Sequence, residues 1–332
     1  MPTSLRSFAK INLGLRIGPR RGDGFHELRT VYQTIALHDV IRVELERGSG
    51  IEIRCKEPKV PLGESNTCYK VADRVMKASQ RSGRVVVQIE KHLPVEGGMG
   101  AASSNAVATM LGLERELAVK LAARDKLRIA AEVGSDLPLF LIGGTVLGVG
   151  RGEEVHPLQD LPVMHLVVVT PSVGVSTPAA FARWDELATR DAELTHRGAA
   201  GTINTFSSSV FGWLSESLLW QNSAAGEPAS GVPAGSGDRA ETPLLDLVRA
   251  GIENDFESVV FPEHPDLREA KRVLEHEGAR YASLSGSGSA LYGLFGSGAE
   301  ARTAAKRMRV EGHATLATRT VARREYWKQL FF

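Results

Sequence analysis

The sequence predicts an α+β fold in two domains, and three observations lead to this prediction. The chain has 332 residues, about twice the length of an average domain of roughly 150 residues. Segments with strand-like alternation and segments with helical periodicity intermix without a strict βαβ repetition. No internal repeat is evident, so we expect two different domains that each combine helices and strands.

The first half of the chain alternates between expected strands and expected helices. The segment DVIRVELE, from Asp39, alternates apolar and polar residues as a half-buried strand does. Pro94 ends the apolar segment RVVVQIEKHLP. The expected strands lie at residues 5–18, 38–55 and 84–94, and the expected helices begin at Asn66, near Ser103 and near residue 124.

The second half continues this mixture. Strands are expected in LIGGTVLGVG and HLVVVTP, and helices in PAAFARWDELATR, HPDLREAKRVLEHEG and SGAEARTAAKRMR. Residues 221–241 are mostly glycine, proline, alanine and serine, which predicts a flexible insertion. We therefore expect one domain over residues 1–160, a second over 161–320 and a tail over 321–332.

The composition excludes several classes of function. The formal net charge is +1, which argues against nucleic acid or an anionic membrane as the main partner. Cys55 and Cys68 lack the spacing of a metal site and indicate a reducing compartment. The longest uncharged apolar run, residues 137–150, is shorter than the roughly 20 residues that span a bilayer. The N-terminus lacks the apolar core of a signal peptide, so we expect a soluble, cytoplasmic protein.

The loop at residues 95–102 lies between an expected strand and an expected helix. Its glycines allow the backbone N–H groups to curl around an anion, and the helix N-terminus favours a phosphate there. Ser103 and Ser104 can cap the helix, or bind phosphate or the ligand shell of a magnesium ion. The Gly-Lys-Ser/Thr of a Walker loop and the spacing of a Rossmann fingerprint are both missing. A tight turn with a serine cap is the alternative interpretation of this loop.

Other motifs also allow two interpretations each. Asp136 is either a turn or N-cap carboxylate or a general base in an apolar setting. Lys10 and Asn12 share one face of a strand, which is either exposed to solvent or turned toward a cleft. Phe25 and His26 follow a turn and form either an ordinary hairpin or a stacking platform for a nucleobase. A second small-residue loop, SLSGSGSALYGLF, modestly favours a polyphosphate site.

The combination and order of these motifs resemble the GHMP small-molecule kinases. The resemblance rests on AKINLGLRIGPRRGDGFHELRTVYQTIALHD, LPVEGGMGAASSNA, GSDLPLFLIGGTVLGVGRGEEV, VVVTPSVGVSTPAAF and SLSGSGSALYGLF. It extends from about residue 5 to about residue 310 and leaves out residues 221–241 and the segment REYWKQLFF. AKINLGL joined to GDGFHEL is the most discriminating part, because most other members of the superfamily lack the second motif.

The resemblance implies two α+β domains with the active site in the cleft between them. It implies ATP as co-substrate, with the loop around the phosphates and Lys91 and Asn66 in the adenosine pocket. Mg²⁺ would bridge the phosphate oxygens, and the sequence assigns no protein ligand to it. The implied ATP-binding residues are Asn66, Lys91, Pro94, Val95, Glu96, Gly97, Gly98, Met99, Gly100, Ala101, Ala102, Ser103, Ser104 and Asn105.

The resemblance also implies the acceptor, 4-diphosphocytidyl-2-C-methyl-D-erythritol of the non-mevalonate isoprenoid pathway. Asp136 matches the catalytic aspartate, which takes the proton of the 2-hydroxyl or orients that hydroxyl, and Lys10 matches its lysine partner. Phe25 and His26 match residues that hold the cytosine, and the segment with Thr177 and Phe181 matches the one that brings an aromatic ring to its other face. The substrate-binding residues implied are Asn12, Phe25, His26, Thr177 and Phe181.

The loop departs from the family pattern at three positions. Glu96, Ala101 and Ala102 stand where the family usually has glycine, and Phe25 replaces a more usual tyrosine. A carboxylate that pointed at a triphosphate would be repelled, so we expect Glu96 to face solvent. These departures leave open a GHMP kinase for another small alcohol, such as mevalonate, homoserine or a sugar, and a non-catalytic nucleotide-binding homologue. The protein is expected to be a monomer or a homodimer.

Overall fold

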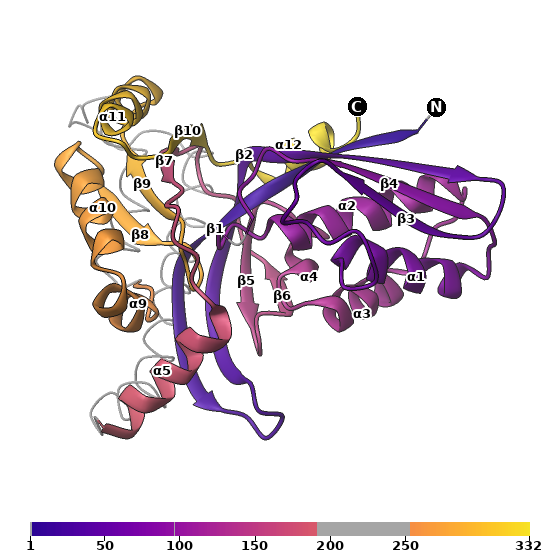
Figure 1. Cartoon of the computed structure of the whole chain (residues 1–332), viewed down its shortest axis with the longest axis horizontal. Coiled ribbons are helices and arrows are strands. Elements are labelled where there is room, and N and C mark those ends of the chain that lie inside the picture. Colours follow the sequence, from indigo (N-terminus) through magenta and orange to yellow (C-terminus); the bar gives the residue numbers. More distant parts are fainter. Residues whose placement is uncertain (1, 96, 191–252) are drawn as a thin grey trace, which may run out of the picture.

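The computed structural model describes residues 2–95, 97–190 and 253–332. Figure 1 shows two parts on either side of a long pair of strands. The predicted insertion at 221–241 and the expected orientation of Glu96 lie outside the described residues. The α+β prediction is confirmed, since both parts combine a sheet with packed helices.

Two long antiparallel strands form the centre of the molecule. β1 (Thr3–Arg20) pairs with β2 (His26–Glu46), and a turn at residues 21–25 connects them. The prediction placed no strand at 26–37 and merged two strands at 38–55, whereas the second strand already begins at His26. β3 (Gly50–Cys55) is a separate strand after a turn. The polar residues scattered through 26–38 hid the strand, because both faces of β2 meet protein along much of this stretch.

The first domain is a six-stranded sheet covered by helices on one face. Five strands have the order β3-β4-β2-β5-β6, and the sixth, β1, pairs with β2 outside this order. Its helices lie below the sheet on the right of Figure 1. The remaining elements are β4 (Arg84–Glu90), β5 (Thr145–Val149), β6 (Glu154–Pro157), α1 (Thr67–Ser79), α2 (Ala101–Glu116), α3 (Ala123–Val133) and α4 (Leu137–Phe140).

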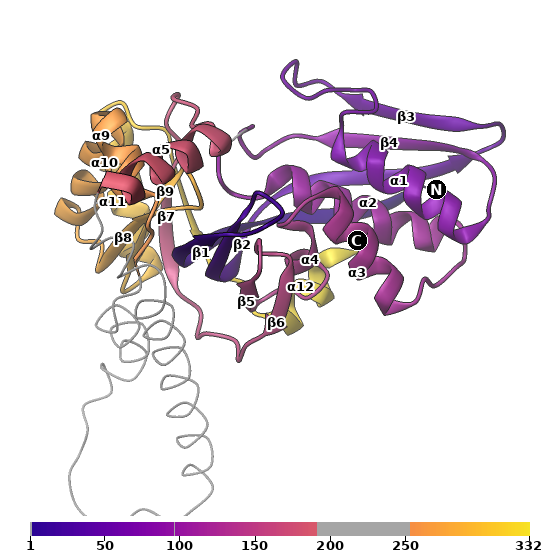
Figure 2. The same cartoon turned by 90° about the horizontal axis from the view of Figure 1, so that it is seen from below.

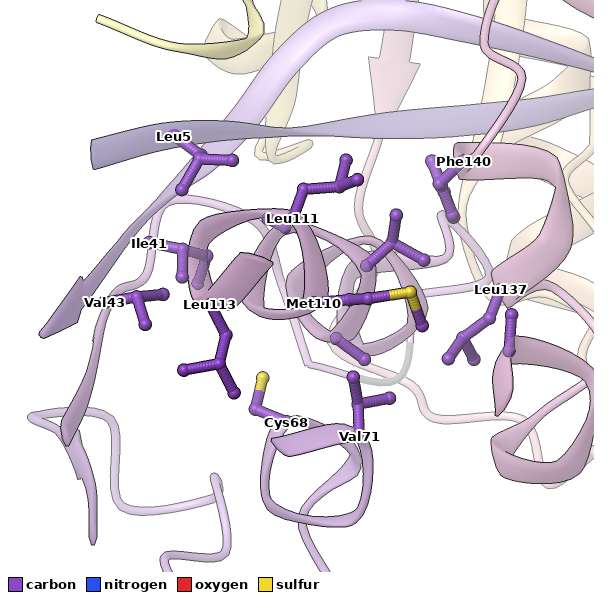
Figure 3. Close-up of a cluster of buried hydrophobic side chains, with 14 of the residues drawn as sticks. Leu5, Ile41, Val43, Cys68, Val71, Met110, Leu111, Leu113, Leu137 and Phe140 are labelled. Atoms are coloured by element: carbon purple, nitrogen blue, oxygen red, sulfur yellow. The ribbon is translucent and has the colours of Figure 1, made fainter. Parts of the chain in front are cut away.

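α2 is the central helix of this domain. It contacts α1, α4, β1 and β2, and nearly all of its length is buried. Figure 3 shows Met110, Leu111 and Leu113 of α2 pointing toward side chains from several surrounding elements. Gly112 lets the helix approach the sheet, because a Cβ there would lie 2.7 Å from Val43 Cγ2. This packing fixes the N-terminus of α2, where the predicted phosphate loop ends.

The second domain is a four-stranded sheet of order β10-β7-β9-β8, with helices on its outer side (Figure 2). The strands are antiparallel to their neighbours. The elements are β7 (His165–Val169), α5 (Thr177–Arg190), α9 (Glu257–Glu263), α10 (Pro265–His276), β8 (Tyr281–Leu284), β9 (Leu291–Phe295), α11 (Gly298–Val310) and β10 (Thr315–Arg319).

The first strand contributes to every part of the core. Leu5 and Phe8 pack in the core of the first domain, whereas Leu15 and Ile17 pack in that of the second. Between them, Ile11 belongs to a third cluster at the joint of the two domains. The final helix, α12 (Arg323–Leu330), returns to the first domain. None of the described helices is long and apolar enough to cross a membrane.

Candidate active site

The loop before α2 has the backbone geometry of an anion-binding turn. Gly98 and Gly100 adopt φ angles of +70° and +67°, which glycine reaches at low cost. Gly100 precedes α2, and no described side chain caps the helix there. The first N–H groups of α2 can therefore donate hydrogen bonds to a bound acceptor, and the helix dipole favours an anion there. The serine-cap interpretation is wrong, because Ser103 and Ser104 both lie inside the helix, which begins earlier than expected.

The second small-residue loop packs directly on the first. Ala290 donates its backbone N–H to Gly97 O at 3.2 Å, and Ser285 Oγ donates to Gly98 O at 3.1 Å. A Cβ on Gly98 would lie 2.3 Å from Ser285 O, so the two backbones approach too closely for any side chain. The two glycine-containing loops, one from each domain, thus pack against each other in backbone contact. The sequence suggested only that both loops belong to one site.

A cavity of about 350 Å³ opens beside the first loop. It gathers most of the residues predicted to bind ATP, together with Lys59, Val60, Pro61 and Ser65, which the sequence analysis missed. Ser104 does not line it, because its Oγ accepts a hydrogen bond from Ser7 Oγ in the interior. The predicted residues that line the cavity are Asn66, Lys91, Pro94, Val95, Gly97, Gly98, Met99, Gly100, Ala101, Ala102, Ser103 and Asn105.

Asn66 lines this cavity, but its polar atoms serve the local backbone. It is the N-cap of α1, where its Oδ1 accepts from Cys68 N at 2.8 Å and its Nδ2 donates to Pro61 O at 2.6 Å. The side chain therefore shapes the wall by joining the segment before α1 to the helix. Cys68, just inside the helix, is a buried thiol whose pKa is raised to about 12 by burial.

A buried carboxylate holds two of the residues that line the cavity, Lys91 and Asn105. Asp39, which is fully buried, accepts hydrogen bonds from Lys91 Nζ, Asn105 Nδ2, His92 N and Leu93 N. It thereby fixes both the lysine and the chain that leads into the loop before α2. Asn105 Oδ1 is buried and has no hydrogen-bond partner among the described residues. The sequence analysis placed Asp39 in a strand and at the end of a family motif but assigned it no role, because its partners lie more than fifty residues away.

Lys10 and Asp136 meet in the structure. Lys10 Nζ lies 3.3 Å from Asp136 Oδ2 and donates to Asn12 Oδ1 at 2.6 Å. The lysine is 3% exposed, whereas the aspartate is 32% exposed. Asp136 forms no cap hydrogen bond with α4, so it does not serve as the cap that local sequence allowed. Lys10 and Asn12 are buried, so the alternative in which this strand face is exposed to solvent is wrong.

Tyr32 holds the other oxygen of Asp136. Its hydroxyl donates to Asp136 Oδ1 at 3.1 Å, and its ring lies 5.5 Å from Lys10 Nζ. Burial, together with the negative charge of Asp136, raises the pKa of Tyr32 well above its usual value. The phenol therefore stays protonated and acts as a donor. The sequence analysis assigned no role to this tyrosine, although it lies in the first motif of the family resemblance.

The aromatic residues of the predicted cytosine site make different contacts in the structure. Phe25 is 52% exposed, and the Arg151 guanidinium lies over its ring at 4.9 Å. His26 instead stacks on Phe181, with ring centroids 5.0 Å apart and planes 9° apart. Its Nε2 is 2.7 Å from Asp185 Oδ1 on α5, a partner that the sequence analysis missed. These contacts bind the β1–β2 turn to α5 in the second domain.

Thr177, at the start of α5, shares a hydrogen bond with Ser287 Oγ at 2.6 Å. A second cavity, of about 450 Å³, lies nearby and is formed by the segment before α5, the phosphate loop and Ser289. Lys59, Pro94, Val95 and Gly97 line both cavities. The loop before α2 thus borders both cavities.

Taken together, these features suit transfer of a phosphoryl group to a hydroxyl. The loop supplies backbone donors for phosphate, and a lysine–aspartate pair lies close by, since a Cβ on Gly100 would be 3.2 Å from Lys10 Cε. The carboxylate is partly exposed and can reach a bound hydroxyl. Among the described residues no three His, Cys, Asp or Glu side chains form a metal-binding cluster.

Comparison with known proteins agrees with this chemistry. The GHMP kinases N terminal domain family matches residues 66–144, and the GHMP kinases C terminal family matches residues 241–314. The 4-diphosphocytidyl-2-C-methyl-D-erythritol kinase of Solibacter usitatus is 37% identical over 88% of this chain and 80% of its own length. The kinase of the same name from Moorella thermoacetica is 33% identical over 96% of this chain and 99% of its own.

Solved structures give the same result. A crystal structure of 4-(cytidine 5'-diphospho)-2C-methyl-D-erythritol kinase is 27% identical, with a TM-score of 0.69 over 96% of this chain and 98% of the other. Homoserine kinase from Cytophaga hutchinsonii is 18% identical, with a TM-score of 0.64 over 97% and 96% of the two chains, and shares the fold. The chain therefore belongs to the GHMP kinases and, within them, to the family of the 4-diphosphocytidyl-2-C-methyl-D-erythritol kinases.

Proposed function

We propose that this small-molecule kinase transfers the γ-phosphoryl group of ATP to the 2-hydroxyl of 4-diphosphocytidyl-2-C-methyl-D-erythritol, a step of the non-mevalonate isoprenoid pathway. The observation that carries the proposal is the Lys10–Asp136 pair, 3.3 Å apart beside the phosphate loop, in a chain of this family. A cytoplasmic location remains part of the proposal, supported by the two free thiols.

The nucleotide would bind in the cavity of about 350 Å³, with its phosphates on the backbone donors before α2. Lys91 and Asn105 lie in its wall, and the unpartnered Asn105 Oδ1 offers an acceptor to a donor on the nucleotide. Asp39 keeps both side chains in place, so that little ordering is needed when ATP binds.

The chemical step needs positioning more than covalent help. Asp136 would orient the acceptor hydroxyl and take its proton, using a carboxylate whose two oxygens are held by Tyr32 and Lys10. Lys10 would stabilise negative charge on the transferring phosphoryl group. Asn12, which accepts from Lys10 Nζ and donates to Thr30 Oγ1, would keep the lysine in position at the edge of the acceptor site.

Mg²⁺ would neutralise charge on the β and γ phosphates when the nucleotide is bound. The described residues fit an ion held mainly by phosphate oxygens and water, because they offer no cluster of three protein ligands. Ser103, which lines the cavity at the start of α2, is the hydroxyl best placed to contact such an ion or a phosphate.

The cytosine would be recognised by Phe25, His26, Phe181 and the segment that begins at Thr177. Support comes from the meeting of His26, Phe181 and Asp185 at the junction of the β1–β2 turn with α5. Phe25 offers an exposed ring at the same turn. Remote binding energy from the base would then align the 2-hydroxyl for attack.

A coupled kinase assay with a panel of acceptors tests the proposal. Purified protein with ATP, Mg²⁺ and the cytidyl substrate is expected to release ADP, and Asp136→Asn is expected to lower kcat by about a thousand-fold. Turnover on mevalonate, homoserine or a sugar, but not on the cytidyl substrate, would instead identify a GHMP kinase for another alcohol. Unchanged acceptor KM values in Phe25→Ala and His26→Ala would also rule out cytidyl recognition.

A further inference from the structure

The short helix α4 links the Lys10–Asp136 pair to the phosphate loop. Asp136 immediately precedes the helix, and Phe140 is its last residue. A Cβ on Gly100 would lie 3.0 Å from Phe140 Cζ and 3.1 Å from Lys10 Cγ, so the phenyl ring, the lysine stem and the loop meet at one point. Any shift of α4 therefore moves the carboxylate and loosens the packing beside the lysine.

The carboxyl-terminal end of α4 is held by α12, although the two helices are far apart in the sequence (Figure 2). Tyr326 OH donates to Phe140 O at 2.7 Å in the interior, and Trp327 Nε1 donates to Ile142 O at 2.9 Å. The tyrosine ring also covers Gly143 so closely that a Cβ there would lie 2.5 Å from Tyr326 Cδ1. The carbonyl of the last residue of α4 and a carbonyl two residues later thus both accept hydrogen bonds from α12.

Arg323 extends this attachment. Its guanidinium donates to Gly143 O at 3.2 Å and to Thr145 O at 2.8 Å, and its backbone N–H donates to Asp160 Oδ2 at 2.7 Å. Asp160 in turn accepts from Thr145 N through its other oxygen. The chain from α4 to β5 is therefore fixed by side chains and backbone of the C-terminal segment.

The C-terminal segment is itself fixed before α12 begins. Val321 N donates to Thr34 O, and Val321 O accepts from Thr34 Oγ1. Thr320 N donates to Met164 O at the start of the second domain. α12 thus starts from a rigid point between the two domains and has little freedom to follow a shift of α4.

We propose that α12 is a positioning element for catalysis, with Tyr326 as its main positioning residue. The phenol holds Phe140 O, the phenyl ring of Phe140 and the stem of Lys10 both border the loop at Gly100, and the helix begins directly after Asp136. Tyr326 acts through these groups and does not touch the substrate. The inference rests on the proposed roles of Lys10 and Asp136.

Tyr326→Phe tests it, because this change removes the hydroxyl and keeps the ring over Gly143. We expect kcat to fall about ten-fold, since small displacements of reacting groups have large effects on rate. The KM for ATP should change less than kcat, because Phe140 borders the cavity's loop at Gly100, whereas Lys59, Asn66 and Lys91 line the cavity from other elements. In an Asp136→Asn background, the same change should lower kcat by less than ten-fold, because the part of its effect that acts through Asp136 is already lost.

Leu330→Ala is the matched control, since Leu330 lies on the same helix and packs in the core of the first domain. It should lower the midpoint of thermal unfolding at least as much as Tyr326→Phe and leave kcat within about two-fold. Unchanged kcat in Tyr326→Phe, or a full further loss in the Asp136→Asn background, would overturn the inference. Full activity of Asp136→Asn alone would instead refute the proposed role of that carboxylate.

Discussion

The imidazole of His26 lies face to face with the phenyl ring of Phe181, with centroids 5.0 Å apart. Phe256 packs edge-on against the same phenyl ring at 4.9 Å. In this arrangement, one face of Phe181 is covered by His26 and is not available to a base. A cytosine held between Phe25 and Phe181, as the family resemblance implies, therefore needs either the opposite face of Phe181 or a shift of His26.

The first prediction follows from this stacking. Phe181→Leu removes the aromatic face and should raise the KM for the cytidyl substrate about ten-fold or more, since stacking on an aromatic side chain contributes roughly 1–3 kcal/mol per base. The KM for ATP should not change. Trp184→Phe, a buried aromatic change one turn further along α5, is the control. Equal KM values in wild type and Phe181→Leu would show that this ring does not contact the base.

The second prediction concerns the hydrogen bond from Tyr32 to Asp136. Tyr32→Phe keeps the ring beside Lys10 but removes the donor that holds Asp136 Oδ1. Because the carboxylate then loses one of the two groups that orient it, kcat should fall by about ten-fold. Steady-state assays measure this loss, and an unchanged kcat would show that the phenol does not help to position Asp136.

The third prediction concerns the buried Asp39. Asp39→Asn leaves Lys91 beside an amide in place of a carboxylate, and breaking a buried ion pair costs about 3–5 kcal/mol. We expect a lower unfolding midpoint in denaturant and a higher KM for ATP. Asp73→Asn breaks the exposed pair with Lys77 and should change stability by less than about 1 kcal/mol. Similar stabilities of the two variants would contradict the role assigned to Asp39.

The fourth prediction is a loss of stability at alkaline pH. Burial raises the pKa of Tyr281 to about 12 and also raises the pKa values of Tyr32, Tyr292 and Tyr326. A raised pKa means that the folded state keeps a proton that the unfolded state loses above its ordinary value of about 10. Stability from these phenols is therefore complete below pH 10 and falls as the pH rises further.

Thermal unfolding measured from pH 8 to pH 11.5 tests this directly. The unfolding midpoint should decline steeply only above pH 10, and Tyr292→Phe should make the decline shallower. Tyr69→Phe is the comparison, since this tyrosine is only half-buried on α1. A decline of the same steepness in Tyr292→Phe would show that other groups cause the alkaline unfolding.

The sequence analysis identified the two charged residues at the centre of the candidate site, and it missed the residues that form hydrogen bonds with the site residues. Lys10 and Asp136 were found because each lies in a recognisable segment, and the structure brings them together. Tyr32 and Asp39 lie in the same motif as Lys10 but were not singled out, because the contacts of each are made with a partner distant in sequence. Asp185 lies outside the motifs, and its histidine partner is also distant in sequence. Such pairings depend on strand register and on domain packing, neither of which a local pattern contains.

The beginning of α2 shows a different limit. The two serines suggested a cap by residue type, but the left-handed backbone of Gly100 ends the loop without one. A helix that receives a phosphate at its N-terminus needs no side-chain cap, because the ligand takes its place. The C-terminal helix was placed outside the family resemblance, yet its side chains hold the segment that follows Asp136.

β1 contributes side chains to the cores of both domains and to the cluster between them. Separate expression of residues 1–160 and 161–332 would therefore leave the second fragment without Leu15 and Ile17 and the first without α12. Neither fragment contains a complete core, so we expect both to aggregate alone and to become soluble only when produced together. In engineering terms, the two sheets are not exchangeable modules. When half of the chain is exchanged with a relative, β1 and β2 have to match the cores of both halves.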